Sequence, residues 1–582
     1  MAGRAHNGGV RLVGLAQAAA GVVLLAVAPG PTGLVSALTG AGVAAVGLLW
    51  LVRVLSRPVG AGAGTPVGRG LRLSAAAVGV VLVAVGVVAL TWREASVRAL
   101  AGVLSVGLVA HGVGLVTWGD RGRDAGDRLA SVLLGAASAT LGLVVLAWPR
   151  LSLHLVAALV GAWLVLVGLG TALTGATRAG PGARRRRLLP AVASVLVAAL
   201  LLTGTIWLHR GSPRVVPDAF YTPPASVPDE PGRLIRARPL TTGVPDGLRG
   251  WLILYTTTDG AGTPAAASGT VLAPPRGTQG ELPVVAVGHG TTGVVPRCAP
   301  SLSAAPFGDG AAAALEEVVR SGRVAVMTDY VGLGTAGPHA YLVGPDAAHA
   351  VLDSVRAAQE LPDVAVGDQV VAWGHSQGGH AVLWTGVLAA RYAPDLDLLG
   401  VAAFAPASDL HALADDLRTA AIGKLVAAYI AGSWDASFPE LAVGSQLTPT
   451  YRRVVDRITD LCFSGRDVLS ALATATQLSR EVFVPGALDG PIGERLRENS
   501  PDAPIPIPVL LAQGSDDPLV LPAQQARYVA AQCAAGVVLT SHVYDGRDHV
   551  SLVAADSPLT ADVVAWTQAR FRGEPATASC AG

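Results

Sequence analysis

Charge, and lysine above all, is what this sequence has least of. Only 14% of its 582 residues are charged, lysine is almost absent, and the formal net charge is +1. Binding to nucleic acid needs a basic surface, so this composition argues against a nucleic-acid-binding protein. There is also no Cys-x-x-Cys pattern and no histidine cluster. We therefore expect no metal site and no other cofactor.

Hydrophobic residues are abundant instead, at 51% of the chain. Seven segments in the first third are each about as long as the roughly 20 apolar residues that cross a bilayer. They predict an all-α membrane bundle over residues 1–208. The predicted spanning helices are 12–28, 34–52, 73–92, 99–118, 129–148, 153–173 and 188–208.

This region contains an internal repeat. Arg11-Leu12, Arg72-Leu73 and Arg128-Leu129 each open a pair of apolar segments, so the first six helices are expected to form three hairpins. The pattern resembles the small HdeD-type membrane proteins, a resemblance that implies no function. A transporter or sensor is the less favoured interpretation, because the spans hold His111 and His154 but no carboxylate.

Arginine predicts the orientation of the bundle. Arginines such as Arg53, Arg121 and the run 184–187 fall in alternate loops, and positively charged loops face the cytoplasm. The N-terminus is therefore expected inside and the chain after 208 outside, in a multi-pass protein of the cell membrane. All four cysteines lie in that outer part, at Cys298, Cys462, Cys533 and Cys580. An even number in an exported domain indicates disulfides, with three pairings possible.

The outer part contains a candidate nucleophile. Gly374-His375-Ser376-Gln377-Gly378 follows an apolar strand that starts near 370 and precedes a helical stretch that runs to 392. Glycine is so common here that the pentapeptide alone says little. A strand before it and a helix after it are typical of a nucleophile elbow, in which the serine hydroxyl is exposed on a sharp turn. Ser376 is the predicted nucleophile.

Two later segments supply an acid and a base. A predicted strand at 507–512 leads to Asp517, with neighbouring Asp516 as the alternative acid. A second strand at 537–544 leads into a polar loop with His549, the predicted base. A serine hydroxyl needs a histidine to take its proton, and a carboxylate orients that histidine. The other histidines, at His339, His349, His380, His411 and His542, are expected to be packed or surface residues.

The oxyanion of such a reaction needs hydrogen-bond donors. A strand at 282–287 ends in the glycine-rich run 288–293, which can present a backbone N–H beside that of Gln377. Thr291 is the predicted second donor, and Thr292 is the alternative.

These motifs together resemble the secretory lipase family of α/β-hydrolases. Gly-His-Ser-Gln-Gly-Gly at 374–379, Asp-Tyr-Val-Gly-Leu-Gly at 329–334 and Leu-Asp-Ser-Val-Arg-Ala at 352–357 carry the resemblance, which extends over 234–572. It implies an ester hydrolase that acts on acylglycerols or related esters, with Ser376, Asp517 and His549 as its triad. It also implies a helical cap at 409–500 and disulfides Cys298–Cys462 and Cys533–Cys580.

The sequence thus predicts a membrane bundle at 1–208, an extended linker at 209–233 and an α/β-hydrolase domain at 234–582. The predicted function is that of a membrane-tethered serine hydrolase whose partners are an ester substrate and the lipid bilayer. A peptidase or an acyltransferase with the same triad is the nearest alternative, because the triad serves any acyl transfer.

Overall fold

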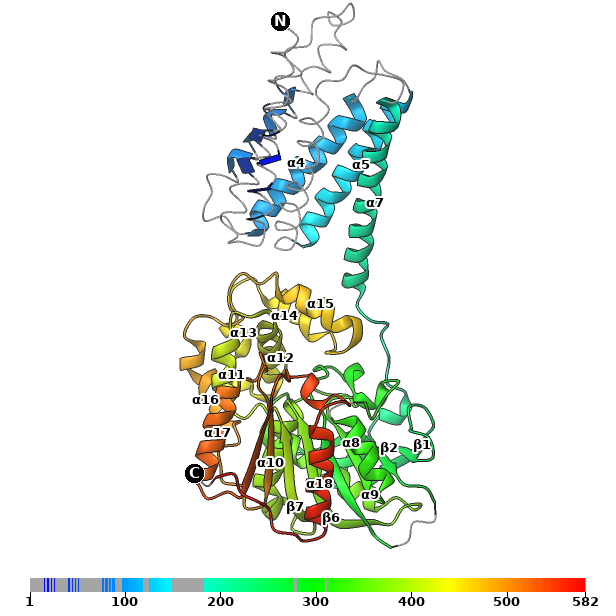
Figure 1. Ribbon diagram of the computed structural model, residues 1–582, viewed down its shortest axis with the longest axis vertical. Helices are drawn as coiled ribbons and strands as arrows, with labels where there is room; N and C mark the ends of the chain where they lie inside the picture. The colour runs from blue at the N-terminus through cyan, green and yellow to red at the C-terminus, as the bar shows by residue number, and fades with distance from the viewer. Residues whose placement is uncertain are drawn as a thin grey trace, which may run out of the picture. The chain divides into compact units, whose positions relative to one another are not determined.

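The computed structural model describes residues 97–118, 125–148, 183–276, 280–308 and 311–580, together with isolated helical positions before residue 89 (Figure 1). The chain divides into two compact units. The first is Met1–Arg210 and the second is Gly211–Gly582.

In the first unit the described helices are α4 (Val97–Trp118), α5 (Ala125–Ala147) and α7 (Ala183–Arg210). Glycine lets α4 and α5 approach closely, since a Cβ built on Gly112 would lie 2.5 Å from the Gly135 carbonyl oxygen. Small residues at helix contacts are typical of membrane helices. Large apolar side chains such as Leu200 are exposed, as expected for a surface that lipid covers.

The predicted spans 99–118, 129–148 and 188–208 correspond to these three helices. Among the described residues, Arg128–Ala147 and Ala191–Arg210 are long and apolar enough to cross a membrane, and α4 contributes a shorter apolar stretch. The other four predicted spans lie outside the described residues, apart from isolated helical positions. They are 12–28, 34–52, 73–92 and 153–173. A seven-helix bundle therefore stays a prediction.

The second unit is built on a mixed nine-stranded sheet with the order β1-β2-β3-β5-β4-β6-β7-β8-β9. The pairs β1–β2, β2–β3 and β3–β5 are antiparallel and the remaining pairs are parallel. The strands are β1 (Leu234–Leu240), β2 (Arg249–Thr258), β3 (Pro264–Ala273), β4 (Leu282–Gly288), β5 (Val324–Val331), β6 (Val366–His375), β7 (Asp397–Phe404), β8 (Val509–Gly514) and β9 (Leu539–Tyr544).

Both faces of the sheet are buried under helices (Figure 1). On β6, Val370 and Ala372 face one core while Val371 and Trp373 face the other. Burial on both faces explains why the parallel strands are continuous apolar runs in the sequence. The first face packs against α9 (Gly344–Gln359), α10 (Gln377–Tyr392) and α17 (Pro522–Ala534), and the second against α8 (Ala312–Arg320) and α18 (Leu559–Phe571). The α/β fold predicted for this part of the chain is confirmed.

Two strands begin later than predicted. β8 starts at Val509 rather than at 507 because Pro508 has no N–H to donate to a strand ladder, so the first donor is the Val509 N–H, which bonds to the Val538 carbonyl. β9 starts at Leu539 rather than at 537, since the Val537 N–H is used at the end of α17, where it bonds to Gln532.

A helical insertion separates β7 from β8, and we call it the cap. Its hydrophobic core is distinct from the two cores of the sheet, and Figure 1 shows its helices gathered at one end of the strands. The Asp409 side chain accepts a hydrogen bond from Ala412 N–H and so begins the first helix. The α-helices are α11 (Leu410–Leu417), α12 (Ala421–Ser437), α13 (Val443–Gln446), α14 (Arg452–Thr459), α15 (Gly465–Ala475) and α16 (Pro491–Glu498).

The segment predicted as an extended linker, 209–233, is not a free tether. α7 continues to Arg210, and the residues after it pack on the second unit. The Ser212 N–H bonds to the buried Asp467 carboxylate, and Tyr221, in a 3-10 helix at Ala219–Tyr221, donates to or accepts from Ser301 at 2.9 Å. Aromatic residues in a polar, proline-rich stretch explain the difference, because burial of Phe220 and Tyr221 offsets the cost of ordering the chain.

The cysteines form two disulfides. Cys298 pairs with Cys462, which joins the α/β core to the cap, and Cys533 pairs with Cys580, which holds the C-terminal tail beside β9. These are the two pairs that the family resemblance implied.

Candidate active site

Ser376 lies on a sharp turn between β6 and α10. Its backbone has φ 57° and ψ −117°, in the left-handed half of conformational space that a serine rarely adopts. The turn is held by the Ser376 N–H, which donates to the Phe404 carbonyl at 2.9 Å. Strain of this kind persists only where the surroundings impose it, and it is typical of functional sites.

The glycines on either side of Ser376 are required by space. A Cβ on Gly374 would lie 2.0 Å from the Gly378 carbonyl oxygen, and a Cβ on Gly378 would lie 1.9 Å from the Gly288 carbonyl oxygen. Real side chains cannot approach backbone so closely. The Gly-x-Ser-x-Gly pattern is therefore the signature of tight packing between α10, β6 and the end of β4.

His549 and Asp517 meet near the carboxyl ends of the parallel strands. His549 Nδ1 is 2.8 Å from Asp517 Oδ2, and the Asp517 side chain is fully buried. The N–H groups of Leu519 and Val520 donate to Asp517 Oδ1, and Gln513 Nε2 donates to Oδ2. These bonds fix the carboxylate so that it can orient the imidazole. Asp516, the alternative acid, is exposed and bonds to Ser515 instead.

His375 brings the loop of His549 to the elbow. His375 Nε2 donates to the His549 carbonyl at 2.8 Å, and the two rings are 4.6 Å apart. Burial lowers the pKa of His375 to about 3, so its ring stays neutral and does not add a charge beside His549. The sequence did not assign His375 a role, although its place directly before Ser376 was a usable signal.

The run 288–293 also lies beside Ser376. A Cβ on Gly290 would lie 3.4 Å from the His375 carbonyl oxygen and 3.9 Å from Ser376 Cβ. The Thr291 hydroxyl is 2.8 Å from the Tyr341 hydroxyl, whereas the Thr292 side chain is buried and its carbonyl accepts the Phe463 N–H of the cap. The loop predicted to supply an oxyanion donor is therefore adjacent to the elbow.

The histidines expected to be ordinary differ in their surroundings. His380 is buried and donates to the Asn499 carbonyl, His349 stacks on Tyr392, and His411 and His542 are partly or fully exposed. His339 is different, because its Nε2 is 3.1 Å from the side-chain nitrogen of Gln377, next to the elbow. Neither His339 nor Tyr341 could be linked to the site from the sequence.

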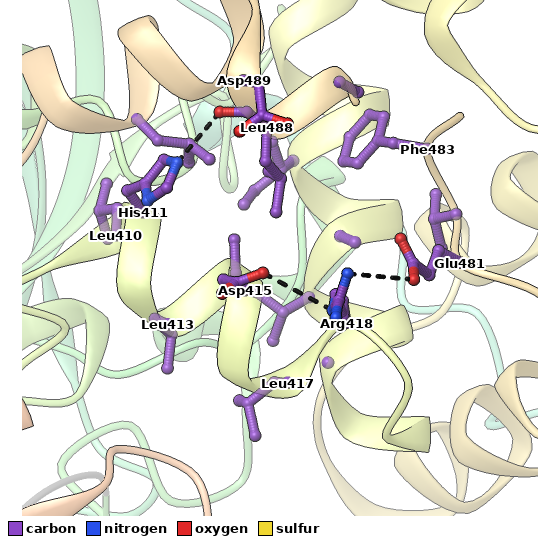
Figure 2. Close-up of a pocket in the computed structure, with 18 of the residues that line it drawn as sticks. Leu410, His411, Leu413, Asp415, Leu417, Arg418, Glu481, Phe483, Leu488 and Asp489 are labelled. Carbon is purple, nitrogen blue, oxygen red and sulfur yellow. Dashed lines mark hydrogen bonds and ion pairs between the residues drawn. The ribbon is translucent and has the colours of Figure 1, made fainter. Parts of the chain in front are cut away.

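The cap encloses a cavity of about 170 Å³ (Figure 2). Its wall is mostly aliphatic, with contributions from α11, α12 and the segment before α16, for example Leu413, Ile430 and Leu488. Polar side chains line it in two places: Arg418 is 3.6 Å from both Asp415 and Glu481, and His411 and Asp489 lie apart from that group (Figure 2). Two lining residues connect the cavity to the elbow region along the chain. Leu410 lies three residues after Ala407, whose N–H bonds to the Ser376 carbonyl. Leu342 directly follows Tyr341, whose hydroxyl contacts that of Thr291.

The chain is similar to known lipases. Residues 311–579 match the family model described as Secretory lipase. Probable inactive lipase MT1628 of Mycobacterium tuberculosis is 27% identical over 389 residues, or 62% of this chain and 83% of that protein. Lipase 4 of Candida albicans is 24% identical over 62% of this chain and 83% of its own length. The closed state of Candida antarctica lipase A has the same fold, with TM-score 0.52 and 19% identity, over 63% of this chain and 90% of that one.

In the first unit, residues 77–145 and 133–203 match a short repeat of unknown function. The two matches begin 56 residues apart, the same spacing as Arg72 and Arg128. The internal repeat is therefore present, and with the apolar helices it indicates membrane association.

Fold and similarity together define the second unit as a lipase- and esterase-like α/β-hydrolase. The chain is a carboxylic ester hydrolase, as its sequence predicted. The Mycobacterium tuberculosis relative is named as a probable inactive lipase, which is a statement about that protein and not about this chain. In this chain a serine, an aspartate and a histidine are all present in the order that the fold requires.

Proposed function

We propose that the chain is a membrane-tethered lipase or esterase that cleaves acylglycerols or related lipid esters through a Ser376, Asp517 and His549 triad. The observation that carries the proposal is the 2.8 Å contact of His549 with the buried Asp517, on a loop held by His375 beside the strained Ser376 turn. Each group has the chemical type and the chain position that its role needs.

The reaction proceeds in two halves. The Ser376 hydroxyl attacks the ester carbonyl while His549 Nε2 takes its proton, and Asp517 stabilises the imidazolium and holds its tautomer. The negative oxygen accepts hydrogen bonds from the backbone N–H groups of Gln377 and Thr291. His549 then protonates the departing alcohol, and water repeats the sequence in reverse to release the acid. In the part of the chain that the structure describes, the Ser376 hydroxyl has no hydrogen-bond partner, so its contact with His549 is expected to tighten once substrate binds.

The cap cavity supports a substrate with an apolar chain. Most of its wall is aliphatic, and each buried CH₂ of an acyl chain contributes about 0.8 kcal/mol of binding free energy. The similar proteins are named as lipases and esterases, which favours an ester substrate over a peptide amide.

Replacement of Ser376 tests the proposal. Ser376→Ala is expected to lower ester hydrolysis by about a million-fold, because the acyl-enzyme cannot form. A fluorophosphonate probe should label the wild type and not the variant. Ser515→Ala, which removes a hydroxyl from the nearby acid-bearing loop, is the matched control and should keep both activity and labelling. A folded Ser376→Ala variant with more than a few per cent of wild-type activity would refute the triad.

We also propose that the N-terminus is cytoplasmic and that the hydrolase lies outside the membrane. The arginine distribution and the two disulfides support this location, since disulfides persist in oxidising compartments. A reporter that functions only in the cytoplasm should be silent when fused after Gly582 and active when fused before Met1. The opposite pattern would reverse the orientation.

A further inference from the structure

A loop between β5 and α9, residues 339–343, contacts both proposed oxyanion donors; we call it the 339–343 loop. At its start, His339 bonds to the Gln377 side chain at 3.1 Å. At its centre, the Tyr341 hydroxyl is 2.8 Å from the Thr291 hydroxyl. The two residues whose backbone N–H groups would bind the oxyanion are thus held by the same short segment.

The chemistry of His339 suits this contact. Its Nδ1 lies 2.9 Å from the Val331 carbonyl, which can only accept, so Nδ1 carries the proton and Nε2 is left to accept from the Gln377 amide. Burial lowers the pKa of His339 to about 4, so the ring stays neutral near pH 7 and keeps that lone pair. Burial also raises the pKa of Tyr341 to about 12, so its hydroxyl stays protonated.

The cap holds the same loop. The Ser433 hydroxyl, on α12, donates to the His339 carbonyl at 2.6 Å and accepts the Tyr341 N–H at 2.8 Å. The indole N–H of Trp434 donates to the Tyr341 carbonyl at 2.9 Å. All of these groups are buried. A single turn of α12 therefore satisfies the backbone on both sides of Tyr341.

The loop also reaches the cap cavity. Leu342, directly after Tyr341, lines the cavity, as do Val426, Ala427 and Ile430 of α12. Leu342 has φ 56°, a strained conformation for a leucine, which shows that the surrounding contacts impose the shape of the loop. The 339–343 loop thus lies between the cavity wall on one side and Gln377 and Thr291 on the other.

We infer that His339 and Tyr341 are positioning residues for the oxyanion hole, and that Ser433 of the cap sets their place. This inference rests on the proposed function. The cap then has a second role besides covering the substrate, since it completes the alignment of the groups that stabilise the transition state. Such groups accelerate a reaction only when they are held in place before the charge develops.

Two conservative variants test the inference. Tyr341→Phe removes the hydroxyl that holds Thr291, and Ser433→Ala removes the hydroxyl that holds the loop. The full loss of one oxyanion donor costs about 10²- to 10³-fold in kcat, so loss of a donor's support should cost about tenfold, with KM changed by less than about twofold. Matched controls are Tyr451→Phe, whose hydroxyl bonds to Ser479 within the cap, and Ser437→Ala, one turn along α12.

Affinity for a trifluoromethyl ketone gives a readout that a merely structural role would not change. The Ser376 hydroxyl adds to the ketone carbonyl, and the resulting oxyanion occupies the oxyanion hole. The inhibition constant should therefore rise in Tyr341→Phe and Ser433→Ala by about the same factor as kcat falls. Because Ser433 acts through the loop that carries Tyr341, the double variant should lose little more than the more damaged single variant.

The outcomes separate the two proposals. An inactive wild type, or an active Ser376→Ala variant, removes the proposed function and the inference with it. An active wild type in which Tyr341→Phe and Ser433→Ala match their controls in kcat and in inhibitor affinity overturns the inference alone. Equal losses in variants and controls, or a rise in KM with unchanged kcat, also overturn it. If Tyr341→Phe fails to fold, Ser433→Ala against Ser437→Ala decides the question.

Discussion

The α/β core and the cap of the second unit use apolar side chains in different ways. In the core, strands buried on both faces pack so closely that the space beneath the elbow is only about 10 Å³, no more than one water needs. In the cap, amphipathic helices leave a cavity of about 170 Å³. The core is thus suited to holding reactive groups in fixed geometry, while the cap has room for part of a substrate.

Polar contacts follow the same division. In the core, Asp517 is fixed by three donors besides His549, two N–H groups of its own loop and the Gln513 side chain at the end of β8. In the cap, Ser433 and Trp434 bond to the backbone of the 339–343 loop, between β5 and α9 of the core. With the proposed triad, the comparison assigns the chemistry to the core, and the inferred role of the cap is to act through its shape and through the 339–343 loop.

The largest expected effect tests whether the chemistry is confined to the core. Asp517→Asn should lower kcat by about 10³- to 10⁴-fold on a short, soluble ester, because an amide cannot hold the reactive tautomer of His549 or stabilise its charged form. Asp516→Asn is the matched control and should change kcat by less than about twofold, since that side chain is exposed. Comparable losses of kcat in the two variants would show that the acid role is not specific to Asp517.

The disulfides test the connection between core and cap. Replacement of both cysteines of one pair by serine should cost about 2 to 4 kcal/mol of unfolding free energy. The Cys298–Cys462 pair should cost more, because its sequence separation is 164 rather than 47. Its loss should also lower kcat, since Cys298 packs against Gly293 of the run 288–293, where a Cβ would lie 2.6 Å from the sulfur. Urea unfolding of the full chain in detergent, with kcat measured in parallel, checks both expectations.

Loss of Cys533–Cys580 serves as the control for that experiment. It should reduce stability without a change in kcat, because this pair holds the C-terminal tail. A larger effect on kcat from this pair than from Cys298–Cys462 would contradict the assigned roles.

The smallest expected effect tests the cavity. Ala427→Phe should fill it and lower kcat/KM for long-chain esters by about tenfold, equivalent to the burial of about two fewer CH₂ groups, while short esters are unaffected. Ala436→Phe, at an exposed position of the same helix, is the control. An unchanged chain-length profile in folded Ala427→Phe would show that the cavity does not bind the acyl chain.

Much of the second unit could be predicted from local sequence. Apolar runs marked the strands, Gly-x-Ser-x-Gly marked the turn at Ser376, and the position of the cap followed from family resemblance. The start of β8 was misplaced because hydrophobicity does not show that Pro508 lacks an N–H, and the start of β9 because it does not show that the Val537 N–H is used at the end of α17. The burial of Phe220 and Tyr221 within the predicted linker was not foreseen, because these two residues stand in a stretch that is otherwise typical of a tether.

The sequence by itself determined which groups are available for the reaction and in which order they occur, because turns, apolar periodicity and cysteine usage are local properties of the chain. Only the tertiary structure decided what supports them. Tyr341 meets Thr291 across 50 residues, and Ser433 meets His339 across 94. Contacts at such distances depend on how buried donors and acceptors are paired after the chain has packed, and no pattern of neighbouring residues records that pairing.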